Sequence, residues 1–266
     1  MESSLKATIE LFVKRLMSRS ALTDKEVSAL LELRGSPKVY RSHSDLVRRG
    51  DLLEHSCLVV DGLVGRFGQN GEGERQISGL YIAGDMADLP SVVSPAAGWG
   101  IGSLSQTTIL RIPHVQLRHL ASQYPGIAEA FWRDCVADGS IFSEWVVNVG
   151  RRDSLSRLAH LFCEMAVRSE RAGLGDRTFF RLPITQIDLA DATGLTGVHV
   201  NRILKKLREA SIANFRSGEV TIQDWDQLVS VGDFDPAFLL FGGPSPRITE
   251  PTGSSMKNVP QPAPAA

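Results

Sequence analysis

Side chains suited to binding nucleic acid are concentrated between Thr196 and Arg208. This stretch holds four lysine or arginine residues and no acidic residue, whereas the whole chain of 266 residues has a formal net charge of −1. Phosphate binding by a chain of near-zero net charge requires a local positive patch of this kind. An arginine such as Arg202 bonds guanine through two hydrogen bonds, and an asparagine such as Asn201 reads adenine or holds a phosphate. The predicted chemistry is recognition of duplex DNA.

The spacing of apolar residues in this stretch predicts a helix with two unlike faces. Four apolar side chains recur at positions i, i+3, i+4 and i+7, which lie on one face of a helix and are expected to be buried. They are Val200, Ile203, Leu204 and Leu207. The remaining positions, with Thr196 as the helix cap, carry the predicted DNA-binding residues. These are Thr196, Val198, His199, Asn201, Arg202, Lys205 and Lys206.

The elements around this helix predict a winged helix-turn-helix. Residues 184–193 are typical of a short helix, and Gly194 supplies the tight turn that a helix-turn-helix needs. Residues 214–222 are typical of a β-hairpin with Ser217 and Gly218 at its tip, and a hairpin in this place is a wing. The alternative is a helix pair whose basic face is only solvated. The agreement of turn, cap, spacing, charge and hairpin favours DNA binding.

A second apolar pattern precedes this unit and predicts a long helix for pairing two chains. Apolar residues step by 4 and 3 from 131 to 149, as in the seam of a packed helix pair, with Asp138 interrupting them. The predicted dimerisation residues are Phe131, Cys135, Phe142, Trp145 and Val149. A helix that lies on its own domain explains the pattern equally simply, and both interpretations stay open here.

The N-terminal half is expected to combine helices with a small barrel or roll. Thr23 and Glu26 form a capping-box pattern within 35 residues of helical character. From residue 36, short β-rich runs alternate with glycine and aspartate turns, and the last predicted strand covers 107–112. Asn70-Gly71 predicts a type I′ turn, whose two central residues both need positive φ.

Composition restricts the class of protein. Apolar residues make up 42% of the chain and charged residues 22%, which is ordinary for a soluble globular protein. No apolar run approaches the ~20 residues of a membrane span, and no signal-peptide core is present, so a cytoplasmic location is expected.

The three cysteines, Cys57, Cys135 and Cys163, lack the spacing of a zinc or iron–sulfur site. No metal and no cofactor is expected, and His160 beside Cys163 is interpreted as a packing residue.

Several segments together resemble the Crp/Fnr family of bacterial regulators, from about residue 10 to residue 235. The matching segments are Arg49-Gly50-Asp51, residues 58–64 and 71–75, Gly84-Asp85 and the helix-turn-helix run 187–207. The resemblance implies an α+β fold with double-stranded DNA, a second copy of the chain and RNA polymerase as partners. The expected parts are N-terminal helices (1–35), a β-roll sensor domain of the cyclic-nucleotide-binding type (36–123), a dimerisation helix (124–150), a winged helix-turn-helix domain (151–242) and a disordered tail (243–266).

The chain departs from the family where operator and effector are recognised. Val198 stands where the family usually has a glutamate, so a different half-site is expected. Members that bind cyclic AMP have a Gly-Glu-Leu stretch and an Arg-Ser or Arg-Thr pair that holds the phosphate. Here residues 84–90 lack the glutamate, and residues 97–100 replace the pair with Ala-Gly-Trp-Gly. Since no arginine lies between Arg75 and Arg111, dependence on cyclic AMP is not expected, and the effector is unknown.

Two other classes of function fit the residues less well. A small-molecule sensor that acts through a protein partner would use the helix-turn-helix as a protein-binding surface, which its basic face and wing disfavour. An enzyme is not expected, because no nucleophile, base and orienting residue follow a recognisable order, and residues 98–102 lack the spacing of a dinucleotide-binding loop. A homodimeric, sequence-specific DNA-binding regulator is therefore the leading prediction.

Overall fold

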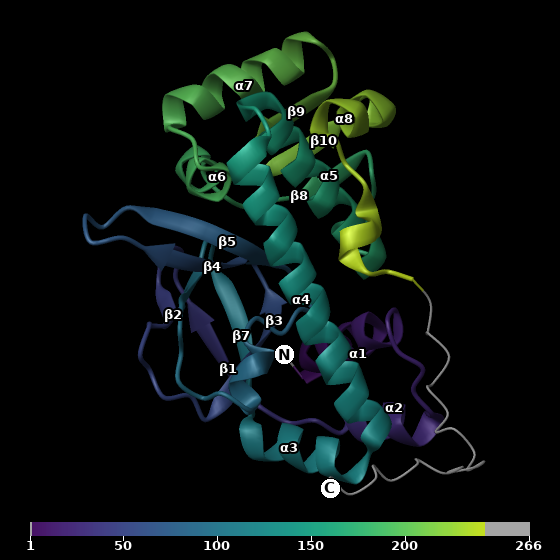
Figure 1. Ribbon diagram of the computed structural model, residues 1–266. Coiled ribbons are helices and arrows are strands. Elements are labelled where there is room, and N and C mark those ends of the chain that lie inside the picture. The colour runs from purple at the N-terminus through teal and green to yellow at the C-terminus, as the bar shows by residue number, and fades with distance from the viewer. Residues whose placement is uncertain (1, 243–266) are drawn as a thin grey trace, which may run out of the picture.

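The computed structural model describes residues 2–242, with side chains from residue 4 onward. The predicted tail, 243–266, lies outside the described residues. A β-roll and a helical lobe are joined by one long helix, α4 (Pro125–Arg151), which runs the length of the molecule (Figure 1). Among residues 2–242, no helix is long and apolar enough to cross a membrane.

The β-roll consists of two antiparallel sheets. The first has the order β1 (Ser36–Tyr40), β7 (Thr107–Pro113), β3 (His55–Asp61). The second has the order β2 (Asp45–Val47), β6 (Gly100–Ser103), β4 (Val64–Gln69), β5 (Arg75–Tyr81), and η1 (Leu89–Val92) follows β5 in the chain. Side chains such as Val59, Val64, Ile101 and Ile109 are fully buried in one cluster. The strands predicted from the sequence are confirmed, including the last one.

The prediction of a type I′ turn at Asn70-Gly71 is wrong. Strands β4 and β5 are joined by a five-residue loop, 70–74, in which Gly73 is the residue with positive φ, +86°. The Asn70 side chain accepts hydrogen bonds from the backbone N–H groups of Glu72 and Glu74, at 3.1 and 2.9 Å. Because this side chain forms the turn itself, the chain does not need the two-residue mirror-image turn.

Helices cover one side of the β-roll. They are α1 (Glu2–Met17), α2 (Asp24–Leu31) and α3 (His114–Gln123), together with the first half of α4. Phe12 of α1 stacks on Phe131 of α4, with ring centroids 6.3 Å apart. The capping box predicted at the start of α2 is confirmed: Thr23 Oγ1 accepts from the Glu26 N–H, and Glu26 accepts from the Thr23 N–H at 2.8 Å.

The helical lobe begins with α5 (Ser154–Ala172), whose N-cap is Asp153. It continues with β8 (Phe179–Arg181), α6 (Gln186–Thr193), α7 (Gly197–Glu209), β9 (Ala213–Arg216), β10 (Glu219–Ile222), α8 (Trp225–Gly232) and η2 (Pro236–Leu239). Phe162, Phe180 and Leu189 are fully buried at its centre. His160 is also buried, with its ring 5.2 Å from Phe234 and 5.5 Å from Phe238, so it packs as predicted.

Helix α4 turns the predicted dimer seam partly toward its own chain. Phe131 and Trp145 are buried, 6% and 4% exposed, because they pack against α1 and α5. These two side chains are therefore covered within one chain, in line with the alternative interpretation of the pattern. Cys135 and Val149 are half-buried, and Phe142 is 44% exposed. As contacts between two chains, the five residues stay a prediction.

A different stripe of α4 faces outward. It lies one position further along the chain and keeps the steps of 4 and 3. Its members, here called the exposed stripe, are Trp132, Val136, Gly139, Ser143, Val146 and Gly150. Trp132 is 69% exposed and Val136 62%, so within residues 2–242 a large apolar surface on this helix is uncovered.

The interior of the junction between roll and lobe is ionic. Arg168 of α5 donates to Glu164 at 2.7 Å, to Asp85 at 2.8 Å and to the Leu80 carbonyl at 2.7 Å. Asp85, part of the Gly-Asp motif after β5, also pairs with Arg15 of α1. Because these side chains come from α1, the roll and α5, the network holds the three parts together.

Asp138, which interrupts the predicted apolar seam, belongs to the same network. Its carboxylate accepts from Arg15 at 3.3 Å and from the Tyr81 hydroxyl at 3.2 Å. Asp134, one turn earlier, accepts from Arg15 at 2.8 Å and from Arg19 at 3.0 Å. Burial raises the pKa of Asp138 to about 6. The acidic residue in the seam is thus an internal ionic contact of one chain.

Candidate nucleic-acid interface

The helix-turn-helix is built by α6, a tight turn and α7. Thr185 caps α6 in a capping box with Asp188, in which Asp188 Oδ2 accepts from the Thr185 N–H at 2.8 Å. Gly194 ends α6 with φ +63°, a left-handed conformation that costs glycine least. Thr196 then caps α7 by accepting from the His199 N–H at 3.4 Å. The turn at Gly194 and the cap at Thr196 are both as predicted.

The two faces of α7 are confirmed by burial. Val200, Ile203, Leu204 and Leu207 are 0–6% exposed. All seven predicted DNA-binding side chains are exposed, and Val198 is 81% exposed. These seven side chains form one solvent-facing surface, which we call the α7 face.

Two of the basic side chains of the α7 face are free of ion pairs within residues 2–242. Lys205 forms a weak pair with Glu209, at 3.6 Å between side chains that are 64% and 62% exposed. The Thr196 hydroxyl lies 3.1 Å from Nδ1 of His199, which holds the imidazole beside the helix start. Within residues 2–242, neither Arg202 nor Lys206 lies within 4.0 Å of a carboxylate. Within the described residues, no ion pair therefore holds the Arg202 guanidinium in place.

The structure adds two residues that sequence reasoning missed. A shallow hollow of about 340 Å³ lies beside α7, and Gln186 of α6 and Arg208 line it together with Asn201, Arg202 and Lys205. Arg208 stood in the basic stretch but was not placed on the binding face. Gln186 had no signal of its own in the sequence, because only the packing of α6 on α7 brings it to this surface.

The wing is a tight hairpin with basic edges. Ser217 and Gly218 at its tip have φ of +54° and +75°, which confirms the predicted turn. Glu219 of β10 pairs in register with Arg216 on one side and Arg181 on the other. Both arginines are exposed, and Arg181 was missed because β8 lies some way before the wing in sequence.

The interface also touches the β-roll. Nε2 of His43, in the loop before β2, lies 3.1 Å from the Asp188 carboxylate. The Gln76 side chain of β5 donates to the Asp191 carbonyl at 2.7 Å. Arg157 of α5 donates to the Thr193 carbonyl at 3.1 Å, next to the turn. The contacts of His43 and Gln76 set the orientation of α6, and with it that of α7, relative to the roll (Figure 1).

Comparisons with known proteins agree with this geometry. A family model for the Crp-like helix-turn-helix domain matches residues 156–231. The Fumarate and nitrate reduction regulatory protein of Yersinia pestis is 21% identical over 89% of this chain and 90% of its own. The protein of the same name from Vibrio cholerae is 20% identical over 82% of this chain and 87% of its own.

Two solved structures share the fold. The match to FixK2 from Bradyrhizobium japonicum covers 75% of this chain and 98% of the FixK2 chain, with a TM-score of 0.68 and 22% sequence identity. A transcriptional regulator of the CRP family from Thermus thermophilus covers 74% of this chain and 97% of its own, with a TM-score of 0.58 and 14% identity.

A β-roll, a long connecting helix and a capped helix-turn-helix with an exposed basic face define a DNA-binding transcription regulator. The family-model match identifies residues 156–231 as a Crp-like helix-turn-helix domain, and the chain is similar to Crp/Fnr-type regulators along most of its length. Within residues 2–242, no group of three or more His, Cys, Asp or Glu side chains is placed to hold a metal ion.

Proposed function

We propose that the protein acts as a homodimer that binds a pseudo-palindromic DNA site through α7, without cyclic AMP. The observation that supports DNA binding is the α7 face. It presents seven exposed side chains opposite four buried ones, on a helix whose N-terminus is capped by Thr196. In this proposal the roll within 36–123 senses, residues 124–150 pair two chains, and residues 151–242 bind DNA. RNA polymerase beside the site is the partner through which transcription changes.

The roles on the α7 face follow from side-chain chemistry. Arg202 is assigned to a guanine, which it contacts through two hydrogen bonds, and Asn201 to an adenine or a phosphate. His199 and Lys206 bind phosphates, and Val198 contacts a thymine methyl group. Lys205 contributes charge alone, and its loose pair with Glu209 opens at little cost.

The exposed stripe of α4 supports the homodimer. Trp132, Val136 and Val146 stand outward at the spacing of a coiled-coil seam, and Gly139 and Gly150 allow close approach of a second helix. Dimers of helix-turn-helix proteins place two recognition helices about one turn of DNA apart, ~34 Å. We therefore propose half-sites with that spacing, and the seam one residue further along than the one predicted from the sequence.

The side chains between the roll and α4 support independence from cyclic AMP. In the region that would hold the cyclic phosphate, Trp99 instead receives the guanidinium of Arg66, 5.5 Å from its ring. The same guanidinium lies 5.5 Å from the Phe142 ring of α4, and Tyr81 bonds to Asp138 of that helix. Residues of the chain itself thus join the roll to α4.

The test is selection of binding sequences from random duplex DNA with purified protein and no added nucleotide. A palindromic site is expected. Arg202→Ala should weaken binding to it by about 1–3 kcal/mol and relax preference at one base pair in each half-site. Lys205→Ala should weaken all sequences alike and reduce the salt dependence.

Arg34→Ala is the matched control, because this exposed arginine lies between α2 and β1, at the end of the molecule opposite α7 (Figure 1). It should leave both affinity and sequence preference as in the wild type. A selection in which Arg202→Ala recovers the wild-type sequence preference would show that α7 does not read the bases. A requirement for added cyclic AMP would contradict the effector part of the proposal.

A further inference from the structure

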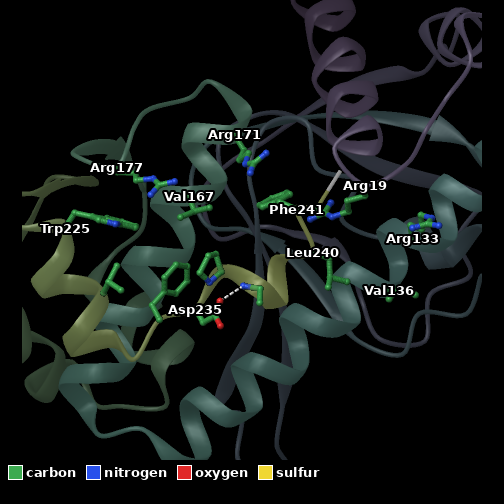
Figure 2. A pocket seen from close by; sticks show the side chains of 15 residues that line it. Arg19, Arg133, Val136, Val167, Arg171, Arg177, Trp225, Asp235, Leu240 and Phe241 are labelled. Atoms are coloured by element: carbon green, nitrogen blue, oxygen red, sulfur yellow. Dashed lines mark hydrogen bonds between the residues drawn. The ribbon is translucent and has the colours of Figure 1, made fainter. Parts of the chain in front are cut away.

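A pocket of about 770 Å³ lies between the helical lobe, α4 and the segment after α1 (Figure 2). Pockets of about 300–1,000 Å³ are usual for small-molecule sites. Its walls come from both parts of the molecule. Arg19 and Val136 belong to the N-terminal segment and to α4, whereas Val167 and Trp225 belong to α5 and α8.

The remaining wall is a C-terminal strap, residues 233–241, that runs from α8 back toward α1. Leu239 of the strap is buried, and its carbonyl accepts from Arg19 at 3.0 Å. Arg152 donates to the Asp233 carbonyl at 3.1 Å, at the other end of the strap. The strap follows residues 156–231, the part matched by the family model.

The body of the pocket is apolar and aromatic. Trp225 and Phe234 face each other edge to face with centroids 6.4 Å apart, and Phe241 lies in the middle of the pocket in Figure 2. Val167 and Leu240 stand on either side of Phe241. Such a surface holds the hydrocarbon or aromatic body of a ligand and excludes water from it.

The charged lining of the pocket is strongly biased. Four arginines and one aspartate line it. The arginines follow one side of the pocket in the order Arg177, Arg171, Arg19, Arg133 (Figure 2). The carboxylate of Asp235 already accepts from the Ala237 N–H, at 2.9 Å. An anion in the pocket would therefore bind at an arginine.

Arg171 is the arginine best placed to bind that anion. Arg177 pairs with Glu170 at 2.9 Å, Arg133 with Glu129 at 2.7 Å, and Arg19 with Asp134 at 3.0 Å. Within residues 2–242, Arg171 forms no ion pair with a carboxylate. Its guanidinium lies over the Phe241 ring, 5.1 Å from the centroid. A cation held on an aromatic ring at the edge of an apolar pocket matches a carboxylate joined to an apolar body.

We propose that this pocket binds an organic carboxylate with an aromatic or acyl body, its carboxylate at Arg171 and its body between Val167, Trp225 and the strap. The ligand would contact the segment after α1, α4 and the strap together, and so would favour one placement of the lobe relative to the roll. A role as effector rests on the proposed function, whereas binding itself does not.

The test measures binding to the full chain without DNA, by isothermal titration calorimetry. The probes are 2-naphthoate and decanoate, with 2-naphthalenemethanol as the neutral analogue of the first. At least one carboxylate is expected to bind with a Kd below about 1 mM, a free energy of about −4 kcal/mol. The neutral alcohol should bind roughly tenfold more weakly, because it cannot form the charge-assisted bond. Preference between the two carboxylates tells an aromatic ligand from an acyl one.

Two substitutions locate the site. Arg171→Gln should weaken carboxylate binding roughly five- to tenfold and leave the alcohol unchanged. Ala237→Trp, at an exposed position of the pocket wall, should fill the space and abolish binding of all probes. Arg41→Gln is the matched control and should bind as the wild type. Circular dichroism checks that each variant is folded.

Failure of both carboxylates to bind, equal affinity for the alcohol, or wild-type affinity in both pocket variants would overturn the proposal. The outcome is separable from that of the proposed function. Arg202→Ala, which targets DNA reading, should leave probe binding unchanged, and DNA selection without a probe tests the α7 face alone.

Discussion

Arg168 holds the junction between roll and lobe, and its replacement by methionine is expected to destabilise the folded chain by about 3–5 kcal/mol. The side chain is 4% exposed and donates to Glu164, Asp85 and the Leu80 carbonyl, all at 2.7–2.8 Å. Methionine fills much of the same volume, so the change removes the charge and the hydrogen bonds rather than the packing.

The size of this destabilisation follows from the contacts that Asp85 and Glu164 retain after the substitution. Asp85 retains its pair with Arg15 and the Ile82 N–H at 3.0 Å. Glu164 is 0% exposed and, among residues 2–242, retains only the Trp145 indole N–H at 2.8 Å as a hydrogen-bond donor. A carboxylate left buried without its cation accounts for most of the loss. The double variant Arg168→Met with Glu164→Gln should therefore have a free energy of unfolding about 1–3 kcal/mol higher than that of Arg168→Met alone.

The assay is urea unfolding, followed by circular dichroism and by tryptophan fluorescence, with the midpoint and slope fitted together. Arg34→Met is the control, because Arg34 and Glu32 form an exposed pair, 67% and 76% accessible, worth less than about 1 kcal/mol. If Arg168→Met costs no more than this control, the ionic network does not stabilise the junction and the reasoning is refuted.

Three further predictions concern single positions. Burial raises the pKa of Asp88 to about 6, so its ionised form weakens the fold as the pH rises from about 4 to 6. Asp88→Asn should stabilise the chain by about 1–3 kcal/mol above pH 7 in urea unfolding and change nothing below about pH 4. Trp132→Glu, on the exposed stripe, should shift the protein to a monomer in light scattering; an unchanged dimer mass would contradict the proposed seam. Gly194→Ala should cost about 1–2 kcal/mol in thermal unfolding, because its φ of +63° is left-handed, and no loss would show that the turn relaxes.

Local patterns were sufficient for the helix-turn-helix. The cap at Thr196, the turn at Gly194 and the buried positions of α7 depend on residues within a few places of one another. The same local reasoning failed at Asn70, where a side-chain hydrogen bond replaced the expected turn. It also left out Gln186 and Arg181, which reach the candidate interface only through packing and strand pairing.

The face of α4 could not be chosen from spacing. Steps of 4 and 3 connect the residues that start at Phe131 and also those that start at Trp132, and spacing alone does not show which series is buried. Phe131 is buried because Phe12 of α1, far away in sequence, stacks on it. In the sequence, Asp138 interrupts an apolar seam. The structure shows that its carboxylate instead bonds to Arg15 and Tyr81, which are distant in sequence.

By itself, then, the sequence determined the order of elements and the helix α7 with its buried and exposed faces, because capping, turn conformation and apolar periodicity act over a few residues. The tertiary structure alone decided which stripe of α4 is free, which charges are buried together, and that four arginines and a C-terminal strap enclose a pocket. Those features depend on side chains brought together from distant parts of the chain, and burial changes the energy of a charge or an apolar group only once its neighbours are in place.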